Sequence, residues 1–366
     1  MWSHEAYREE KMTKLKDQMT SNERMAAYFD GKEVDRLPAM PMIDSVGPRL
    51  IGEKNRFKRL SAENQVLVQK KAYELLGLDG LSIEYGLHGI GQACGTKLGD
   101  NENSAPHIVE HVLKDLKDVD DLDPECVLRK NDPWIDLCCT ACEMLVDELG
   151  DVVGTSASLT GPLTAAASIY PLPLLLKATR KQPELVNKLL RFSTDALIAV
   201  SEEFAKCGVD IFICDPVASG DIISDKMYRD LVLPYTKEIA PAIHKHNVAM
   251  GYHICGNTNR ITADMLESGC DMLSVDVKVP LLKAKELGGG MMPIIGNVDP
   301  INTMMLGTPE EVRAEVMRDI ADCADSPNGY IVSTGCDIPV DAPKENVLAF
   351  MDAVREYGPT RLGEKK

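Results

Sequence analysis

The chain has 366 residues, of which 44% are hydrophobic, so it is long enough to bury the core of one large domain or of two medium ones. Its formal net charge of −17 at pH 7 repels phosphate backbones, which excludes nucleic acid as an expected partner. No apolar run approaches the roughly 18 residues that a membrane span needs, so we expect no membrane partner either.

Residues 1–20 are highly charged and contain no apolar signal core, so we expect a helical extension on a cytoplasmic protein. In that compartment the 11 cysteines argue against a disulfide framework and favour small buried thiols. One Cys-x-x-Cys pair, Cys139 and Cys142, lies within a predicted helix, whereas a redox motif belongs at a helix N-terminus after a strand. We therefore expect this pair to pack in the core.

Eight short apolar segments rich in β-forming residues predict strands, and segments with helical periodicity separate them. The long stretch at residues 86–132, after the second strand, is interpreted as a loop region that forms a lid. The predicted strands are residues 36–44, 79–85, 151–159, 209–215, 248–254, 271–276, 292–298 and 329–335.

Capping residues mark the predicted helix boundaries. Thr308 precedes a helical segment and Glu311 follows three positions later, which predicts a capping box. Pro343 begins and Gly358 ends another helix, and residues 134–149 form a third. A glycine close to an aspartate precedes several predicted strands, which indicates left-handed helix ends. These glycines are Gly77, Gly150, Gly208 and Gly269.

Eight strands that alternate with helices are typical of a (β/α)8 TIM barrel, which belongs to the α/β class. The alternative is an open doubly wound sheet. No linker rich in proline, glycine or serine divides the chain. We therefore expect a single barrel domain over residues 21–366, preceded by the extension at residues 1–20.

Active sites of this barrel class form at the C-terminal strand ends, and three potential metal ligands lie there. His253 and Cys255 end the fifth predicted strand, and their spacing of two places both side chains on one face. Cys336 follows the eighth strand, where strand ends can converge near the barrel axis. One imidazole and two thiolates suit Zn²⁺ better than Mg²⁺ or Ca²⁺, which prefer oxygen ligands.

Three protein ligands leave a fourth zinc position open, as catalytic zinc requires. Two thiolates cancel the charge of the metal, and a substrate thiol in the open position loses its proton readily. Such a thiolate stays nucleophilic, whereas a strongly Lewis-acidic zinc would quench it. The ligand set therefore predicts alkyl transfer to sulfur better than hydrolysis.

Further polar side chains end the predicted strands at the same rim. Asp215 and Asp221 flank the turn after the fourth strand, and Asn297 ends the seventh. Each of the two carboxylates is interpreted either as a helix cap or ion-pair partner, or as a group of the site. Glu84 and Tyr85 end the second strand. The residues expected to contact substrate or cofactor are Tyr85, Asp215, Asp221 and Asn297.

Several motifs carry a family resemblance. The stretch HICGNTNRITADMLESGCDMLSVD, which begins at His253, together with GNVDP and STGCDIP, closely resembles the zinc-dependent methylcobamide:coenzyme M methyltransferases. Those enzymes belong to the uroporphyrinogen decarboxylase superfamily. The resemblance extends over residues 22–357 through NERMAAYFDGKEVDRLP, GQACG, LTGPLT and DPVASGDIIS.

The resemblance implies a uroporphyrinogen-decarboxylase-like barrel in which His253, Cys255 and Cys336 hold zinc and take part in catalysis. It also implies the reaction: a methyl group passes between a methyl-corrinoid and a zinc-activated thiol such as coenzyme M. The corrinoid, a methylcobamide, is then a co-substrate carried by a separate small corrinoid-binding protein that docks at the barrel mouth. The expected partners are this protein and a small thiol.

The sequence departs from the family pattern at two places. Family members often carry an aspartate after the tyrosine that ends the second strand, but here Gly86 follows Tyr85. Glu84 is therefore expected to take over a polar, catalytic role or to be the resting fourth zinc ligand. Decarboxylase members carry an arginine-rich stretch after the first strand, but here that stretch reads MPMIDSVGPRL and contains only Arg49. This argues against uroporphyrinogen as the substrate, because its buried carboxylates need paired cations.

Other functions stay open as alternatives. The enzyme could load a methyl group from a small donor onto the corrinoid protein, or pass it from the corrinoid to tetrahydrofolate. A uroporphyrinogen-type decarboxylase is less favoured because of the missing arginines. A non-catalytic barrel that docks a corrinoid protein around a structural zinc is also less favoured, because the fourth zinc position is open.

Overall fold

The structure is a computed structural model that describes residues 17–365. Of the predicted extension at residues 1–20, positions 1–16 therefore lie outside the described residues. The last part, residues 17–20, is not helical; it leads into the first described helix, α2, which Thr20 caps.

The elements follow one another as alternating strands and helices over most of the described chain. The strands are β1 Leu81–Glu84, β2 Lys97–Gly99, β3 His107–Glu110, β4 Thr155–Thr160, β5 Asp210–Cys214, β6 Met250–Ile254, β7 Met272–Val275, β8 Ile294–Val298 and β9 Tyr330–Thr334. The helices are α2 Ser21–Phe29, α3 Gly47–Leu50, α4 Ala62–Leu76, α5 Gly89–Ala93, α6 Pro133–Leu149, α7 Pro162–Ile169, α8 Leu172–Lys181, α9 Pro183–Ala205, α10 Asp225–Leu231, α11 Leu233–His244, α12 Thr262–Leu266, α13 Leu281–Gly288, α14 Pro309–Cys323 and α15 Lys344–Tyr357. Four 3₁₀ turns complete the set: η1 Asn55–Arg59, η2 Leu116–Asp121, η3 Pro124–Val127 and η4 Pro216–Ala218.

Seven strands form one sheet in the order β1-β4-β5-β6-β7-β8-β9, and the strands β2 and β3 form a separate antiparallel hairpin. The pairs β4–β5, β5–β6, β7–β8 and β8–β9 are parallel. Helices intervene between these strands along the chain, which gives the βαβ repeat of a (β/α)8 fold. The predicted fold class is thereby confirmed.

The first predicted strand, residues 36–44, is not a strand but takes the eighth position of the barrel. Ala39 forms an isolated parallel bridge with Val332 of β9, and the Ala39 carbonyl accepts from the Asp79 N–H, just before β1, at 3.0 Å. Pro38 and Pro41 flank this bridge. A continuous ladder fails here because proline has no N–H to donate.

The other seven predicted strands are confirmed to within a few residues at each end. Every residue of β6, β8 and β9 is buried. Burial on both faces is characteristic of parallel strands covered by helices, and it explains why these segments are almost continuously apolar in sequence.

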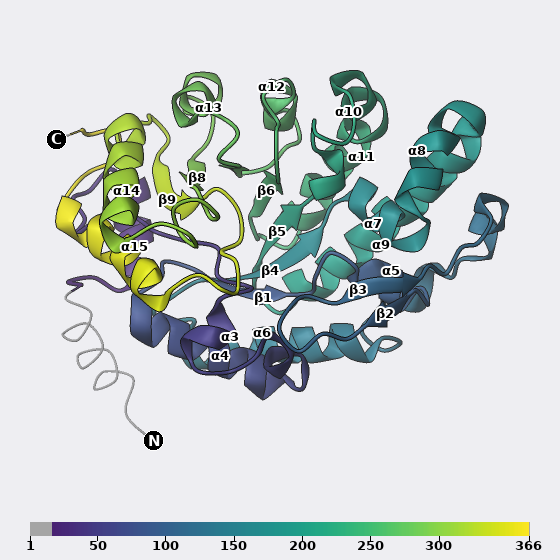
Figure 1. The fold of residues 1–366 in the computed structure, drawn as a ribbon, viewed down its shortest axis with the longest axis horizontal. Helices are drawn as coiled ribbons and strands as arrows, with labels where there is room; N and C mark the ends of the chain where they lie inside the picture. Colours follow the sequence, from purple (N-terminus) through teal and green to yellow (C-terminus); the bar gives the residue numbers. More distant parts are fainter. Residues whose placement is uncertain (1–16, 366) are drawn as a thin grey trace. The chain divides into compact units, whose positions relative to one another are not determined.

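Contacts divide the described chain into two compact units, each assembled from separated segments. The first unit holds the residues as far as Ser82, residues 144–155 and the chain from Met272 onward. The second unit holds residues 83–143 and 156–271. In the first unit α14 packs along α15, and in the second α9 packs against α7, α8 and α11 (Figure 1).

Helix ends follow the predicted caps with one exception. Gly77, Gly208 and Gly269 have positive φ angles, of 70°, 77° and 89°. Gly77 caps α4 directly, and Gly208 and Gly269 follow the last residues of α9 and α12 by three positions. Gly150 does not take a left-handed conformation, although its N–H still bonds the Val146 carbonyl at the end of α6. Gly358 has a φ of 74° after α15, which confirms the predicted stop.

Residues 86–132 are more ordered than the predicted loop. They contain α5, the β2–β3 hairpin, η2 and η3. The segment is attached to α7 of the same unit, because the Thr96 hydroxyl donates to the Ser168 carbonyl at 2.8 Å and the Leu113 N–H donates to the Ile169 carbonyl at 3.2 Å. Elements this short leave little periodicity in a sequence, which is why the segment resembles a loop.

A buried ion network organises the first unit. The guanidinium groups of Arg24 and Arg36 are 1% exposed, and both donate to the carboxylate of Asp79, Arg24 at 2.6 Å and Arg36 at 2.5 Å. Arg24 also pairs with Asp35 at 2.7 Å, and the Asp79 carboxylate accepts from the Ala39 N–H. The motif NERMAAYFDGKEVDRLP thus supplies charges that fix the chain before β1.

No helix among residues 17–365 is both long and apolar enough to cross a bilayer.

The capping box of α14 is expected to contribute measurably to stability. The Thr308 hydroxyl accepts from the Glu311 N–H at 3.3 Å, and the Glu311 carboxylate accepts from the Thr308 N–H at 2.8 Å. Thr308→Ala should lower the free energy of unfolding by about 1 kcal/mol, because one helix N–H loses its acceptor. Urea denaturation measures this change. Thr308→Ser keeps the hydroxyl and serves as the control; equal losses in both variants would contradict the assignment.

A second prediction concerns the pH dependence of stability. Asp319 on α14 is buried and accepts a bond of 3.4 Å from the Asn297 N–H; burial, with a contribution from the Glu315 charge, raises the pKa of Asp319 to about 7. Its folded pKa exceeds its unfolded pKa, so its stabilising contribution is complete below about pH 4 and is lost as the pH rises through about 7. The denaturation midpoint of the wild-type protein should therefore fall between about pH 4 and about pH 7, and Asp319→Asn should remove this fall. An identical decline in the variant would contradict the prediction.

Candidate metal centre

His253 and Cys255 lie together at the C-terminal end of β6. His253 is 1% exposed, and its Nε2 lies 3.3 Å from the Sγ of Cys255, which is half-buried. Successive strand residues point to opposite faces, so residues two apart share one face. The side-chain arrangement predicted from the His-x-Cys spacing is therefore present within one unit.

Cys336 follows the last strand, β9, and is also half-buried. It belongs to the first unit, whereas His253 and Cys255 belong to the second. A tetrahedral ion with a Zn–N bond of about 2.0 Å and a Zn–S bond of about 2.3 Å separates these two ligand atoms by about 3.5 Å, so His253 and Cys255 could hold one ion together. Cys336 stays the predicted third ligand.

The loop that carries Cys255 is braced by the loop after β5. Gly256 has a φ of 84°, and a Cβ atom there would lie 2.6 Å from both the Asp221 carboxylate and the Ser219 hydroxyl. The Asp221 carboxylate accepts from the Asn257 N–H at 3.1 Å, and the Gly220 N–H donates to the Asn257 carbonyl at 3.0 Å. Asp221 therefore acts on the residues next to Cys255, and glycine is required at position 256.

Asp215 caps a helix, which is one of the roles that the sequence predicts for it. Its carboxylate accepts from the Thr164 N–H at 2.9 Å, from the Thr164 hydroxyl at 2.5 Å and from the Leu163 N–H at 3.3 Å, all at the start of α7. Burial raises the pKa of Asp215 to about 6. Its own N–H donates to the His253 carbonyl at 3.0 Å. Asp215 thus fixes the strand that carries His253, and its direct contact with substrate stays a prediction.

Glu84 and Tyr85 point to opposite faces of the chain at the end of β1. Tyr85 is buried, its ring centroid lies 5.8 Å from that of Phe204 on α9, and burial raises its pKa well above the usual value. Its hydroxyl has no hydrogen-bond partner in the described part of the chain. The ring of Tyr85 therefore packs toward the helices, and its contact with substrate stays a prediction. Glu84 is half-buried on the other face.

Asn297 ties loops together at the end of β8. Its side-chain amide donates to the Asp276 carbonyl at 3.0 Å and to the Val279 carbonyl at 2.8 Å. These bonds use both amide hydrogens and hold the loop between β7 and α13. The observed role of Asn297 is therefore a brace, and its contact with substrate stays a prediction.

Sequence reasoning missed two features around the Cys255 loop. Ser219 was not singled out, although its hydroxyl accepts from the Asp221 N–H at 3.3 Å. A pocket of about 330 Å³ opens beside the same loop. Only the motifs DPVASGDIIS and HICGNTNR, which contribute its walls, hinted at this pocket. The residues that line it are Gly220, Ile223, Ser224, Asp225, Asn257, Asn259, Arg260 and Ile261.

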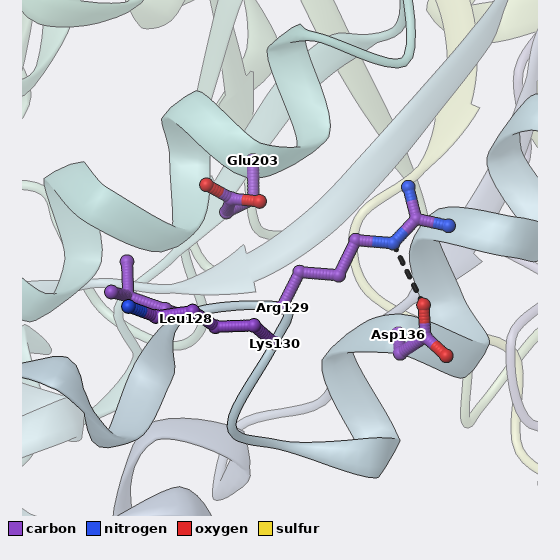
Figure 2. A pocket seen from close by; sticks show the side chains of 5 residues that line it. All are labelled: Leu128, Arg129, Lys130, Asp136 and Glu203. Atoms are coloured by element: carbon purple, nitrogen blue, oxygen red, sulfur yellow. Dashed lines mark hydrogen bonds and ion pairs between the residues drawn. The ribbon is translucent and has the colours of Figure 1, made fainter.

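A larger pocket of about 580 Å³ lies elsewhere in the second unit, and Figure 2 shows the side chains around it. Arg129 donates to the Asp136 carboxylate at 2.8 Å and also pairs with Glu143. None of the three potential metal ligands lines this pocket. The guanidinium group of Arg129 already forms these ion pairs, so we assign no binding site to this pocket. The lining residues are Leu128, Arg129, Lys130, Asp136 and Glu203.

The Cys-x-x-Cys pair behaves as predicted. Cys139 and Cys142 lie in the middle of α6 and are fully buried. Burial raises the pKa of the Cys142 thiol, which keeps it protonated and unreactive.

Comparison with known proteins places the fold and its motifs in a family. The chain is 26% identical over 344 residues to "Methylcobamide:CoM methyltransferase MtbA" of Methanosarcina acetivorans, covering 92% of this chain and 98% of that protein. A solved structure titled "methyltransferase from Methanosarcina mazei" is 25% identical, with a TM-score of 0.79, covering 93% of this chain and 99% of that one. A uroporphyrinogen decarboxylase of Actinobacillus succinogenes is 30% identical over 179 residues, covering 48% of this chain and 49% of that protein.

The family assignment rests on the length of the match. The sequence profile of the family described as "Uroporphyrinogen decarboxylase (URO-D)" matches residues 20–357, which is most of the chain. The resemblance predicted from the motifs is confirmed, since relatives with the predicted activity match nearly their whole length. The chain therefore belongs to the uroporphyrinogen decarboxylase family.

Proposed function

We propose that this protein is a zinc-dependent methyltransferase that moves a methyl group between a protein-bound methylcobamide and a small thiol such as coenzyme M. One observation carries the proposal: the imidazole nitrogen of His253 and the thiol sulfur of Cys255 lie 3.3 Å apart at the end of β6. Cys336, which follows the last strand, is proposed as the third ligand. The relative from M. acetivorans, whose name states this reaction, matches over nearly its whole length and supports the proposed reaction.

The donor set is the reason to choose zinc. Thiolate sulfur and imidazole nitrogen suit zinc, whereas calcium and magnesium take oxygen ligands. Three protein ligands complete only part of a tetrahedron, which leaves room for a substrate sulfur. A bound zinc would lower the pKa of a substrate thiol so that it reacts as a thiolate.

The protein residues set the charge and the position of that reaction. The thiolates of Cys255 and Cys336 would balance the double positive charge of the ion, so the substrate sulfur keeps its nucleophilic character. His253 lies on a fully buried strand, and the Asp215 N–H donates to the His253 carbonyl. The brace of Asp221 and Gly256 fixes the turn after Cys255. Rigid ligands keep the open position in place for the methyl transfer.

Glu84 is proposed as the polar group that serves the thiol substrate. It ends β1 on the face opposite to the buried ring of Tyr85, and a glycine with a φ of 90° follows two positions later. A carboxylate at this strand end can accept the proton of an incoming thiol, or occupy the fourth position before the thiol binds. The corrinoid is proposed to arrive on a separate small protein.

The decarboxylase alternative is disfavoured by the positions of the arginines. Arg49, the only arginine in the stretch MPMIDSVGPRL, is exposed and pairs with Asp341. Arg24 and Arg36 are buried in ion pairs with Asp79. None of the three is placed to bind the propionate groups of a tetrapyrrole, which need paired cations when buried.

The proposed function is tested with free methylcobalamin as the methyl donor. The absorbance change on demethylation is followed against coenzyme M, other thiols and tetrahydrofolate, each with and without a chelator. We expect transfer to a thiol that the chelator abolishes. Full transfer by metal-free protein would contradict the proposal, and zinc-independent release of CO₂ from uroporphyrinogen would establish the decarboxylase alternative instead.

Zinc content provides the first prediction on the ligands. The wild-type protein is expected to bind one zinc per chain, because the proposed site of His253, Cys255 and Cys336 would hold a single ion. Cys255→Ser and Cys336→Ser should each lose most of the zinc and the transfer activity, as measured by elemental analysis and the methylcobalamin assay. Cys270→Ala, which removes a buried thiol outside the ligand set, is the control. Unchanged zinc in Cys336→Ser would refute the three-residue site.

The brace on the Cys255 loop provides a second prediction. Asp221→Ala removes the acceptor of the Asn257 N–H and should weaken zinc binding or lower kcat/KM by about 10–100-fold, since groups that orient metal ligands have effects of this size. Asp221→Asn keeps one oxygen acceptor and should lose less. Asp225→Ala, at the start of α10 in an exposed ion pair with Arg229, is the control. Chelator competition measures the affinity; wild-type values in Asp221→Ala would exclude the brace.

A further inference from the structure

We propose that Cys94 and Cys126 form a redox-active dithiol that closes to a disulfide and fastens the segment between β1 and α6. The two cysteines are 32 positions apart, and their Sγ atoms lie 3.2 Å from each other. Cys94 ends α5, and Cys126 lies in η3. Both belong to the second unit, and neither is a ligand of the candidate metal centre.

The geometry favours bond formation between these two sulfurs. A disulfide bond is about 2.05 Å long, so the sulfurs need to approach by only about 1 Å. Both thiols are half-buried, which leaves them accessible to a small oxidant. By contrast, the Cys-x-x-Cys pair Cys139 and Cys142 is fully buried in α6. The reactive pair is thus formed by the fold and does not follow from a sequence motif.

The environment gives the two thiols different roles. The two thiols share a hydrogen bond in which either sulfur can donate. This bond lowers the pKa of Cys126 and raises that of Cys94; burial and the negative charges of Asp123 and Asp132 oppose the lowering. A thiolate is the nucleophile in thiol–disulfide exchange. Cys126 is therefore the attacking residue and Cys94 the resolving residue.

The reaction is a two-step exchange with a low-molecular-weight disulfide, RSSR. The Cys126 thiolate attacks one sulfur of RSSR, breaks its S–S bond and releases RS⁻, which leaves a mixed disulfide on Cys126. Cys94 then loses its proton and attacks the Cys126 sulfur, and the second RS⁻ leaves. Overall, two cysteine thiols are oxidised to one disulfide while RSSR is reduced to two RSH.

The disulfide would close a loop that contains the β2–β3 hairpin, η2 and the first part of η3. Part of this loop already bonds to α7 through Thr96 and Leu113. Oxidation would add a covalent link between α5, which follows the strand end at Glu84, and η3, which precedes α6. The structure thus assigns the pair a modification that restrains this segment, independently of the proposed methyl transfer.

The test uses the zinc-loaded full-length protein and hydroxyethyl disulfide as the probe. Non-reducing peptide mapping should find a Cys94–Cys126 cross-link that has lost two hydrogens and that a reductant reverses. Cys94→Ser should retain the mixed disulfide on Cys126, because the resolving thiol is missing. Cys126→Ser should give neither a cross-link nor a mixed disulfide at Cys94. Cys139→Ala is the matched control and should form the cross-link to the wild-type extent.

Two results would overturn the proposal. One is stable mixed disulfides on Cys94 or Cys126 of the wild-type protein without a cross-link. The other is no modification of either residue while another thiol reacts. Proteolysis at Glu102, an exposed position inside the closed loop, provides a second readout. The two fragments should remain joined on a non-reducing gel of the oxidised protein and separate in Cys126→Ser.

Discussion

The site depends on one constraint, which is that β6 ends with two donor side chains on the same face. Alternation along a strand places His253 and Cys255 together, and their ligand atoms lie 3.3 Å apart. The two side chains can hold an ion in a fixed geometry only if the turn after Cys255 is rigid. The positive φ of Gly256 and the carboxylate of Asp221 supply this restraint, so the loop after β5 controls the loop after β6.

Buried polar groups elsewhere serve the scaffold. Asp79 accepts bonds from two buried arginines and from the Ala39 N–H, which joins the first, proline-broken strand position to the start of β1. Asp215 caps α7 and bonds the backbone of the strand that carries His253. Charges used in this way are not available to a polyanionic substrate, which agrees with a small thiol better than with a tetrapyrrole.

The chain thus combines the fold of one family with ligands suited to a particular chemistry. The match to the uroporphyrinogen decarboxylase family covers residues 20–357, and a match of this length describes the fold. The donor atoms of His253, Cys255 and Cys336 carry the functional proposal, because function resides in the site and not in the fold. The paired thiols of Cys94 and Cys126 add a second chemistry that the metal centre does not use.

The sequence alone determined the features that arise from neighbouring residues. Seven strands, the capping box of Thr308 and the shared face of His253 and Cys255 follow from local periodicity and hydrogen bonding, which act over a few positions. Cys336 could be added because strand ends of this fold meet at one rim.

Only the tertiary structure decided which distant groups meet. It turned Tyr85 toward Phe204, made Asp215 a cap of α7, reduced the first strand to a bridge at Ala39 and brought Cys94 to Cys126. These outcomes depend on packing between segments far apart in sequence, and no local pattern encodes such contacts.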